Sequence, residues 1–304
     1  MFSKILVPLD GSLLAERALE PALALGRKYG GQVTLLRAPV PEPVFIPSMN
    51  GYAAYSASLA EQVRDGERKD ADDYLSAIKK AHEEGDPPLR TQVVAGDVAE
   101  VILDTAAADK IDLIVMSTHG YSGITRWVLG SVTEKVLAHA PCPVLVIRSS
   151  QPIRKIMIPL DGSELAESAL APGLEAATRL GCSVTLLRAV DELNRFERAQ
   201  LGLGGQDLAN RLQDGMMTEA EYYLGKLIES KPQAGLDIQR VAVIGSAAHR
   251  VLEYAEKNEF DLIVMATHGR TGLARWVYGS VTEKVLHSAH CSMLVIRPAK
   301  HKLN

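Results

Sequence analysis

The sequence predicts an α/β protein of two tandem, doubly wound domains, each with a five-stranded parallel sheet of the Rossmann-like type. Two observations lead to this fold class. The chain repeats itself at an interval of about 150 residues, and short apolar runs alternate with longer amphipathic stretches inside each copy. Alternating strands and helices favour a parallel sheet, because parallel strands need right-handed crossover helices that cover both faces.

The repeat extends over almost the whole chain. Val7–Ser12 returns as Ile158–Ser163 with an offset of 151, and Asp112–Met116 returns as Asp261–Met265 with an offset of 149. A period this long corresponds to a domain with its own core rather than to a solenoid unit. We therefore expect one domain over residues 1–150 and a second over residues 151–304.

The strands of the first copy are short runs, mostly apolar and bounded by Gly, Pro or Asp. They are expected at Lys4–Pro8, Gln32–Arg37, Arg90–Ala95, Asp112–Ser117 and Val144–Arg148. Uninterrupted apolar character, as in Leu113–Met116, is typical of strands covered on both faces.

Helical spacing fills the intervals between these strands. Helices are expected at Leu13–Tyr29, roughly Leu59–Glu83, Val98–Lys110 and Ser131–His139, with Gly30 and Gly85 just past two of the ends. The second copy repeats the order from Lys155 to Arg297. Irregular stretches at Pro39–Ser58 and Asp191–Gln206 follow the second strand of each copy, where either a lid or a plain surface loop would lie.

Composition limits the possible partners and compartments. The first 150 residues carry 15 Lys and Arg against 19 Asp and Glu, and the remainder carries 18 of each. Neither half is basic, which argues against nucleic acid as the main partner. No apolar run approaches the length of a membrane span, and three cysteines without a CxxC pair indicate a reducing compartment. We therefore expect a cytoplasmic protein without a membrane partner.

The best-copied stretch is a glycine-punctuated turn that leads into a helix. His119–Leu137 returns as His268–Leu286, with Gly120, Gly123 and Gly130 matched by Gly269, Gly272 and Gly279. Ser131 with Glu134, and Ser280 with Glu283, have the spacing of a capping box at the helix start. Glycines let a backbone approach a phosphate, and a helix N-terminus favours an anion. The pattern predicts two copies of one anion-binding site.

Asp10 and Asp161 end the first strand of each copy, within Pro-Leu-Asp-Gly-Ser. The carboxyl ends of parallel strands face the ligand crevice, so these carboxylates are placed to accept from a ribose hydroxyl or a base amino group. The alternative is that each aspartate caps the following helix together with Ser12 or Ser163.

These motifs resemble the universal stress protein family, specifically its ATP-binding type, across nearly the whole chain. The family pattern is G-x-x-G, nine residues, then G-S or G-T. The two copies read Ser117-Thr118-His119-Gly120 and Ala266-Thr267-His268-Gly269, each followed by nine residues and Gly-Ser. Ser117 and Ala266 thus replace the first glycine of the pattern.

The resemblance implies an adenine nucleotide alpha hydrolase-like fold that binds ATP, AMP or cyclic AMP, with Mg²⁺ accompanying ATP. The aspartates would contact the nucleoside, the backbone of Ala38 and Ala189 would pair with the adenine edge, and the glycine turns would hold ribose and phosphates. The candidate nucleotide-binding residues are Pro8, Asp10, Ala38, Ser117, His119, Gly120, Gly130, Ser131 and Val132 in copy one, and Pro159, Asp161, Ala189, Ala266, His268, Gly269, Gly279, Ser280 and Val281 in copy two.

The function favoured by these signals is a nucleotide-dependent regulator in a stress response. One alternative is an enzyme, a slow ATPase or adenylyl transferase using Asp10 or Asp161. Another is a nucleotide-free interaction module. No P-loop motif occurs, no residues have the pattern of a catalytic set or of a metal site, and His119 and His268 are expected to pack the turn. Arg126 and Arg275 fit a phosphate contact and a solvated face equally well.

The final expectation concerns assembly. By the resemblance, Val144–Ile147 and Met293–Ile296 lie at sheet edges that pair with a second domain. An exposed sheet edge is normally paired or covered. Since Arg148–Arg154 is a short linker, we expect an intrachain pseudo-dimer, with further homodimerisation through Trp127 or Trp276.

Overall fold

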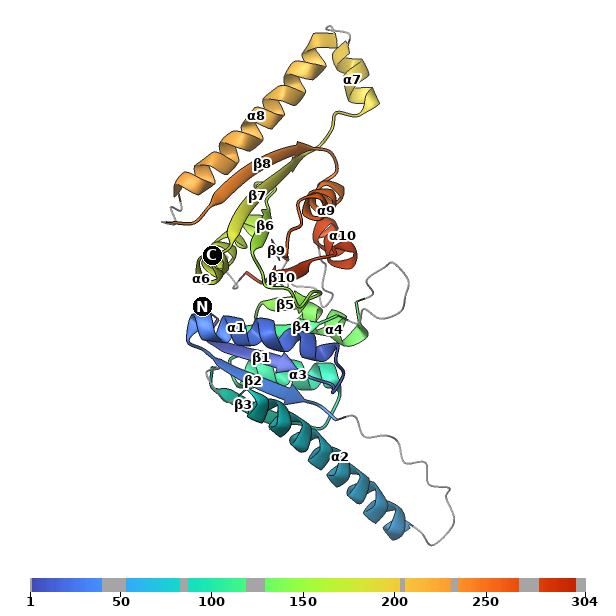
Figure 1. Cartoon of the computed structure of the whole chain (residues 1–304). Helices are drawn as coiled ribbons and strands as arrows, with labels where there is room; N and C mark the ends of the chain where they lie inside the picture. The colour runs from blue at the N-terminus through green and yellow to red at the C-terminus, as the bar shows by residue number, and fades with distance from the viewer. Residues whose placement is uncertain are drawn as a thin grey trace, which may run out of the picture. The chain divides into compact units, whose positions relative to one another are not determined.

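A computed structural model describes residues 2–39, 53–82, 87–118, 129–202, 206–230, 235–267 and 279–298 of the chain. These residues divide into two compact units that separate between Ser150 and Gln151. Each unit contains a parallel sheet with helices on both faces (Figure 1). The predicted α/β, doubly wound fold class is confirmed.

The first unit forms a five-stranded parallel sheet in the order β3-β2-β1-β4-β5. Its elements are β1 (Lys4–Pro8), the short 3₁₀ helix η1 (Ala15–Ala18), α1 (Leu19–Tyr29), β2 (Gln32–Arg37), α2 (Ala53–Ala81), β3 (Leu89–Val93), α3 (Val98–Ala108), β4 (Leu113–Ser117), α4 (Ser131–His139) and β5 (Val144–Ile147). Right-handed crossovers in this strand order place α1 and α2 on one face and α3 and α4 on the other.

The second unit has the matching order β8-β7-β6-β9-β10, again all parallel. Its elements are β6 (Lys155–Pro159), α5 (Glu164–Glu167), α6 (Leu170–Leu180), β7 (Ser183–Val190), α7 (Arg195–Gly202), α8 (Gln206–Ser230), β8 (Ile238–Ile244), α9 (Ala247–Lys257), β9 (Leu262–Ala266), α10 (Ser280–Ser288) and β10 (Ser292–Ile296). Figure 1 shows α6 and α8 on one face of this sheet and α9 and α10 on the other.

One helix predicted as continuous is broken in both units. Instead of a single helix over Leu13–Tyr29, η1 ends at Ala18 and α1 begins at Leu19. Pro21, in the first turn of α1, has no N–H to donate to the carbonyl of Arg17 four residues earlier. Pro172 in α6 has the same effect after the short helix α5. The predicted helix end at Gly30 is confirmed, since this residue has a φ of 60°.

The two stretches predicted to be irregular contain helix. The stretch Asp191–Gln206 includes α7, which starts with a reciprocal capping box. The Asn194 side chain accepts from the Glu197 amide at 3.0 Å, and the Glu197 carboxylate accepts from the Asn194 amide at 2.8 Å. In Pro39–Ser58, helix α2 already begins at Ala53, while residues 40–52 and also Gly85 lie outside the described residues.

A repeated aspartate aligns the first strand of each unit with its neighbour. Asp112, just before β4, accepts from the amides of Ser3 and Lys4, both at 2.9 Å. Asp261, just before β9, accepts from the amides of Arg154 and Lys155 at 2.8 and 2.9 Å. Because these bonds fix where the adjacent strands begin, they also fix which residues meet at the carboxyl ends.

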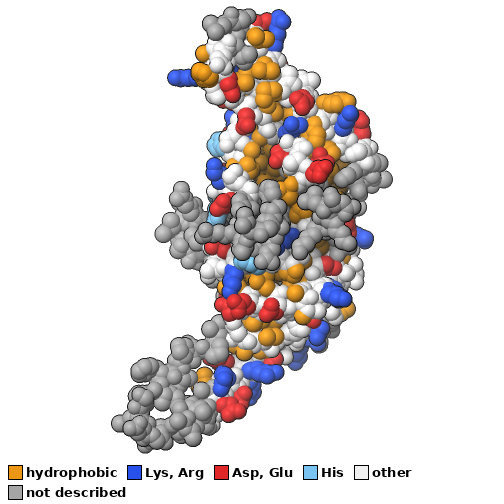
Figure 2. Space-filling view, turned by 180° about the vertical axis from the view of Figure 1, so that it is seen from behind, with side chains coloured by type: hydrophobic (Ala, Val, Ile, Leu, Met, Phe, Trp, Pro, Cys, Tyr) orange, Lys and Arg blue, Asp and Glu red, His pale blue; other side chains and the backbone are white. Residues whose placement is uncertain are grey.

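The described surface carries mixed charge. In Figure 2, Lys and Arg side chains lie among Asp and Glu side chains rather than in a patch of one sign. None of the described helices is long and apolar enough to cross a bilayer. The three cysteines, Cys142, Cys182 and Cys291, are buried and form no disulfide.

Candidate functional site

Each unit has a pocket at the carboxyl ends of its first, second and fourth strands. The pocket of the first unit has a volume of about 370 Å³ and that of the second about 260 Å³. Five of the predicted residues line the first pocket: Pro8, Asp10, Ala38, Ser117 and Val132. Seven line the second: Pro159, Asp161, Ala189, Ala266, Gly279, Ser280 and Val281. Ligands of open α/β sheets bind at this end of the strands.

The aspartate of each pocket uses one carboxylate oxygen to hold its own turn. Asp10 accepts from the Ser12 amide at 2.9 Å, and Asp161 accepts from the Ser163 amide at 2.8 Å. No protein donor to the second carboxylate oxygen occurs among the described residues. The serines complete the start of the following helix, because the Ser12 and Ser163 hydroxyls each accept from an amide three residues on, at 3.1 Å. The carboxylate therefore holds the turn and keeps an acceptor for a ligand.

The capping boxes predicted at Ser131 and Ser280 do not form. Gly130 is the N-cap residue of α4 and Gly279 that of α10, and neither helix has a side-chain cap. Each serine is already the first helical residue, so it lies one position too late to cap. A glycine cap offers no side-chain acceptor, and the amides of the first turn are left for another acceptor. This arrangement suits an anion better than the predicted box would.

The residues that replace the first family glycine have a structural role in one copy only. The Ser117 hydroxyl donates to the Leu14 carbonyl at 2.7 Å, whereas Ala266 has no such group. A second link is common to both copies. The buried hydroxyl of Thr133 donates to the Ser117 carbonyl at 3.5 Å, and that of Thr282 donates to the Ala266 carbonyl at 3.3 Å. These bonds set the helix start against the end of the fourth strand.

The backbone of Ala38 is directed into the first pocket. Leu36 accepts from Leu9 of the β1 side at 2.8 Å, and Arg37 accepts from Val94 of the β3 side at 3.1 Å. Successive residues of a strand alternate their backbone groups between the two neighbours, so Ala38 turns toward the β1 side, beyond the end of β1. The same alternation in β7, with Leu187 accepting from Leu160 and Val190 from Gly245, directs Ala189 into the second pocket.

A repeated cluster of Arg, Tyr and Glu borders each pocket, and the motif analysis did not find it. The Arg37 guanidinium lies over the Tyr74 ring at 4.7 Å, and the Tyr74 hydroxyl donates to Glu16 at 2.9 Å. The same guanidinium packs against Gly11, whose φ is 86°. A side chain at this position would be strained by the backbone and would lie 3.1 Å from the guanidinium, which is a tight contact. The cluster thus fastens helix α2 to the Asp10 turn.

The second copy contains the same cluster. Arg188 lies over the Tyr223 ring at 4.7 Å, and the Tyr223 hydroxyl donates to Glu167 at 2.9 Å. All three residue types recur at the offset of the repeat. Comparing the polar positions of the two copies outside the glycine-rich motifs would have singled out these residues, but not the contacts between them.

Several predicted site residues lie outside the described part of the chain. They are His119, Gly120, Gly123, Arg126 and Trp127 in copy one and His268, Gly269, Gly272, Arg275 and Trp276 in copy two. Gly130 and Ser131 are described, at the start of α4, but do not line the first pocket.

The model of the universal stress protein family matches residues 1–148 and again residues 152–297. A universal stress protein of Methanocaldococcus jannaschii is 32% identical over 156 residues, which is 51% of this chain and 89% of that protein. One from Mycobacterium tuberculosis is 27% identical over 242 residues, 74% of each chain. For another from that species, 28% identical over 196 residues, the matched part is 62% of this chain and 63% of the relative.

The fold also recurs among solved structures. A universal stress protein from Archaeoglobus fulgidus superposes with a TM-score of 0.63 at 19% identity, covering 98% of this chain and 100% of that one. At this identity the likeness concerns the fold alone.

Proposed function

The chain belongs to the universal stress protein family, and from this premise we propose that each of its two units binds an adenine nucleotide and that occupancy regulates the protein. The observation that carries the proposal is the same constellation found twice. Within the described residues, each pocket combines an aspartate carboxylate oxygen that accepts no protein donor, a stretch of strand backbone directed past the end of the first strand, and a helix start without a side-chain cap.

Each part of this constellation fits one part of a nucleotide. The backbone groups of Ala38 or Ala189 that are directed into the pocket offer a donor and an acceptor to the edge of an adenine ring. The apolar side chains of Val98 and Ile102, which line the first pocket, suit the face of the base. The aspartate accepts from ribose hydroxyls, and the uncapped helix start receives phosphate oxygens.

Magnesium would enter these pockets together with the phosphates. Each pocket lining contains one carboxylate, that of Asp10 or of Asp161. Mg²⁺ is commonly held by one or two carboxylates, substrate phosphates and several waters. The donor set therefore fits a magnesium–nucleotide complex better than a protein cage for the free ion.

Calorimetric titration of nucleotide-stripped protein tests the proposal. We expect ATP, AMP or cyclic AMP to bind with a stoichiometry of two per chain, and GTP to bind more weakly because its base edge presents the opposite donor and acceptor. Asp10→Asn and Asp161→Asn should each weaken one of the two binding events about ten- to a hundredfold, since a hydrogen bond to a charged group is removed. Asparagine can still accept from the amide of the turn, so the pocket loop is retained.

The matched control is Asp65→Asn on the exposed surface of α2, which makes the same chemical change away from the pocket and should leave both affinities unchanged. Binding of no adenine nucleotide below about 1 mM would overturn the proposal. Equal weakening by the control would show that net charge, not the pocket carboxylate, matters.

A further inference from the structure

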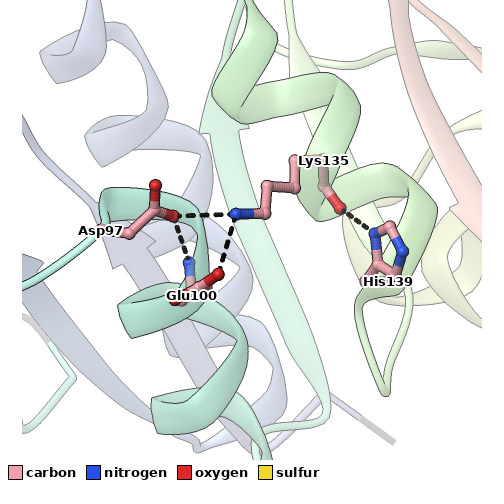
Figure 3. Close-up of polar contacts among 4 residues, drawn as sticks. All are labelled: Asp97, Glu100, Lys135 and His139. Atoms are coloured by element: carbon pink, nitrogen blue, oxygen red, sulfur yellow. Dashed lines mark hydrogen bonds and ion pairs between the residues drawn. The ribbon is translucent and has the colours of Figure 1, made fainter.

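An acidic pair holds a lysine beside the first pocket. Lys135 of α4 donates to Asp97 at 3.1 Å and to Glu100 at 3.2 Å, while Asp97 also accepts from the Glu100 amide as the cap of α3 (Figure 3). The His139 ring lies further along α4, where its Nδ1 contacts the Lys135 carbonyl at 2.9 Å. The pKa of Asp97 is lowered by the Glu100 amide and then by Lys135, and the pKa of Lys135 is raised by Asp97 and then by Glu100. The Asp97 carboxylate and the Lys135 ammonium are therefore both charged at neutral pH.

The second copy keeps the lysine and lacks both carboxylates. Lys284 occupies the position of Lys135 in α10, whereas Ser246 and His249 replace Asp97 and Glu100. Within the described residues, Lys284 has neither a hydrogen bond nor an ion pair. The nearby Arg250 is engaged by Glu253 and by the Ile244 carbonyl, and His249 also lies near Glu253.

Both lysines are close in sequence to residues that line their pockets. Asp97 directly precedes Val98, which lines the first pocket, and Lys135 lies two residues after Thr133, another lining residue. In the second pocket the lining residues Ala247 and Thr282 stand in the same relation to Ser246 and Lys284. Helical side chains lean toward the N-terminus of their helix, so a lysine in the second turn of α10 can approach an anion at the start of that helix.

Among the described residues, three other charged side chains of each Asp turn and its Arg-Tyr-Glu cluster are matched between the copies. Asp10, Arg37 and Glu16 have the counterparts Asp161, Arg188 and Glu167. The helices on the α3 and α4 face differ in net charge from their counterparts α9 and α10. Together with its cap, the first pair carries Asp97, Glu100, Asp104 and Glu134 against Lys135, a net charge of −3. The second pair carries Glu253, Glu256 and Glu283 against Arg250, Lys257 and Lys284, a net charge of 0.

We propose that the two pockets differ in the ligand charge they accept, with the second selecting highly charged phosphate esters such as nucleoside triphosphates and the first tolerating ligands with few phosphates. This inference rests on the proposed function and assigns Lys284, Asp97 and Glu100 as its specificity-determining residues. In the first unit the carboxylates neutralise the lysine and repel phosphate, and in the second the lysine is available to it.

The expected effect follows from Coulomb's law. ATP without metal carries four negative charges and adenosine none, so two carboxylates near the pocket penalise only the nucleotide. At a separation of about 10 Å in water, with screening, this corresponds to about a tenfold change in the ratio of ATP to adenosine affinity. The effect should shrink as ionic strength rises.

The test reads one pocket at a time in the full chain. Ala189→Trp fills the second pocket and Ala38→Trp fills the first, so that each variant retains one binding equivalent. ATP and adenosine are then titrated in EDTA at low salt. Should either tryptophan variant misfold, Asp161→Asn or Asp10→Asn replaces it. We expect a higher ATP-to-adenosine affinity ratio in the second pocket.

Transferring the presence or absence of the two carboxylates between the copies gives the decisive comparison. Asp97→Ser with Glu100→Gln should raise the ratio of the first pocket about tenfold, and Ser246→Asp with His249→Glu should lower that of the second by a similar factor. Because each comparison is made within one copy, other differences, such as Tyr121 against Arg270, cancel. Asp65→Asn with Asp72→Asn on α2 removes the same charge from the opposite face and should change neither ratio.

Equal ratios in both pockets, unchanged by these substitutions, would overturn the inference. So would a fall in melting temperature with no change in ratio, because the ion pairs would then serve only to join α3 to α4. Failure of the proposed function looks different, since neither ATP nor adenosine would bind to either pocket.

Discussion

Tyr74 and Tyr223 each join a long helix to the loop that carries the pocket aspartate. Burial is the main reason that the pKa of each hydroxyl is raised well above that of an ordinary tyrosine, and the hydrogen bond to Glu16 or Glu167 adds to it. The folded protein consequently retains these protons at a pH where the unfolded chain loses them. Stability from these groups is present below about pH 10 and is lost as pH rises above it.

Replacing both tyrosines by phenylalanine tests this effect. Tyr74→Phe with Tyr223→Phe should lower the free energy of unfolding by about 2 kcal/mol at pH 7, about 1 kcal/mol for each hydrogen bond lost. The same variant should lose less stability than the parent between pH 9 and pH 10.5, because the titrating groups are gone. Urea unfolding followed by circular dichroism measures both quantities.

The exposed Tyr222, next in sequence to Tyr223, provides the control. Tyr222→Phe should leave the alkaline loss of stability intact. A double variant with the same alkaline loss as the parent would show that other groups dominate the pH dependence.

At the scale of elements, α1 and α6 pack closely on their sheets through one glycine each. In α1 a side chain at Gly26 would lie 2.7 Å from Pro87, and in α6 a side chain at Gly173 would lie 2.6 Å from Ile158. The repeat gives these helices Ala22 and Gly26 in one copy and Gly173 and Ala177 in the other. At these two buried positions each helix therefore has one alanine and one glycine, in opposite order.

Glycine-to-alanine substitutions should consequently have opposite signs at buried and exposed positions. Gly26→Ala and Gly173→Ala should each destabilise the protein by about 1 kcal/mol, because overpacking costs about 1–3 kcal/mol and outweighs the gain in helix propensity. Gly66→Ala in α2 and Gly215→Ala in α8 have open space around them and should stabilise by about 0.5–1 kcal/mol. Thermal unfolding of the four variants decides the question, and stabilisation by all four would contradict the packing argument.

Strands were more predictable from the sequence than helix boundaries. Apolar composition and flanking Gly, Pro or Asp located β1 and β2 to the residue. The helix predicted over Leu13–Tyr29 was right from Leu19 to its end and wrong in its first part, where a separate 3₁₀ helix lies. Helical periodicity continues through Pro21, and only the missing proline N–H reveals the break. The capping box at Ser131 was wrong by one position, since Gly130 already has the extended backbone of a cap. Helix α7 was missed although Asn194 and Glu197 have capping-box spacing.

For the whole molecule, the repeat was the most informative part of the sequence. Together with the alternation of strands and helices, it predicted the fold class. In that fold, parallel strands end at the same edge of the sheet, which places Asp10, Ala38 and Ser117 in one pocket. The clusters of Tyr74 and of Lys135 were not predicted, because they depend on which faces of separate helices meet. Pattern spacing along one element does not contain that information, while parallel strands automatically align their carboxyl ends.

The last prediction concerns the two halves as separate chains. Strand β5 pairs with β4 through Pro143, Leu145 and Ile147, as the bonds from Ile114 to Pro143 and from Thr118 to Ile147 show. By alternation, the N–H of Val146 points away from β4, toward the outer side of β5. An unpaired strand edge associates readily with another. We therefore expect residues 1–150, expressed alone, to form a homodimer through β5.

Val146→Pro is the sharpest test of that dimer, because it removes an outward N–H without removing a bond to β4. In the isolated half it should convert the dimer to a folded monomer, measured by analytical ultracentrifugation with circular dichroism as the check of folding. In the full chain the linker should give the two halves an effective concentration in the millimolar range. We therefore expect the predicted pseudo-dimer of the full chain to persist although Val146→Pro weakens the pairing at β5. A monodisperse, well-folded monomer of unsubstituted residues 1–150 at micromolar concentration would contradict the predicted edge pairing.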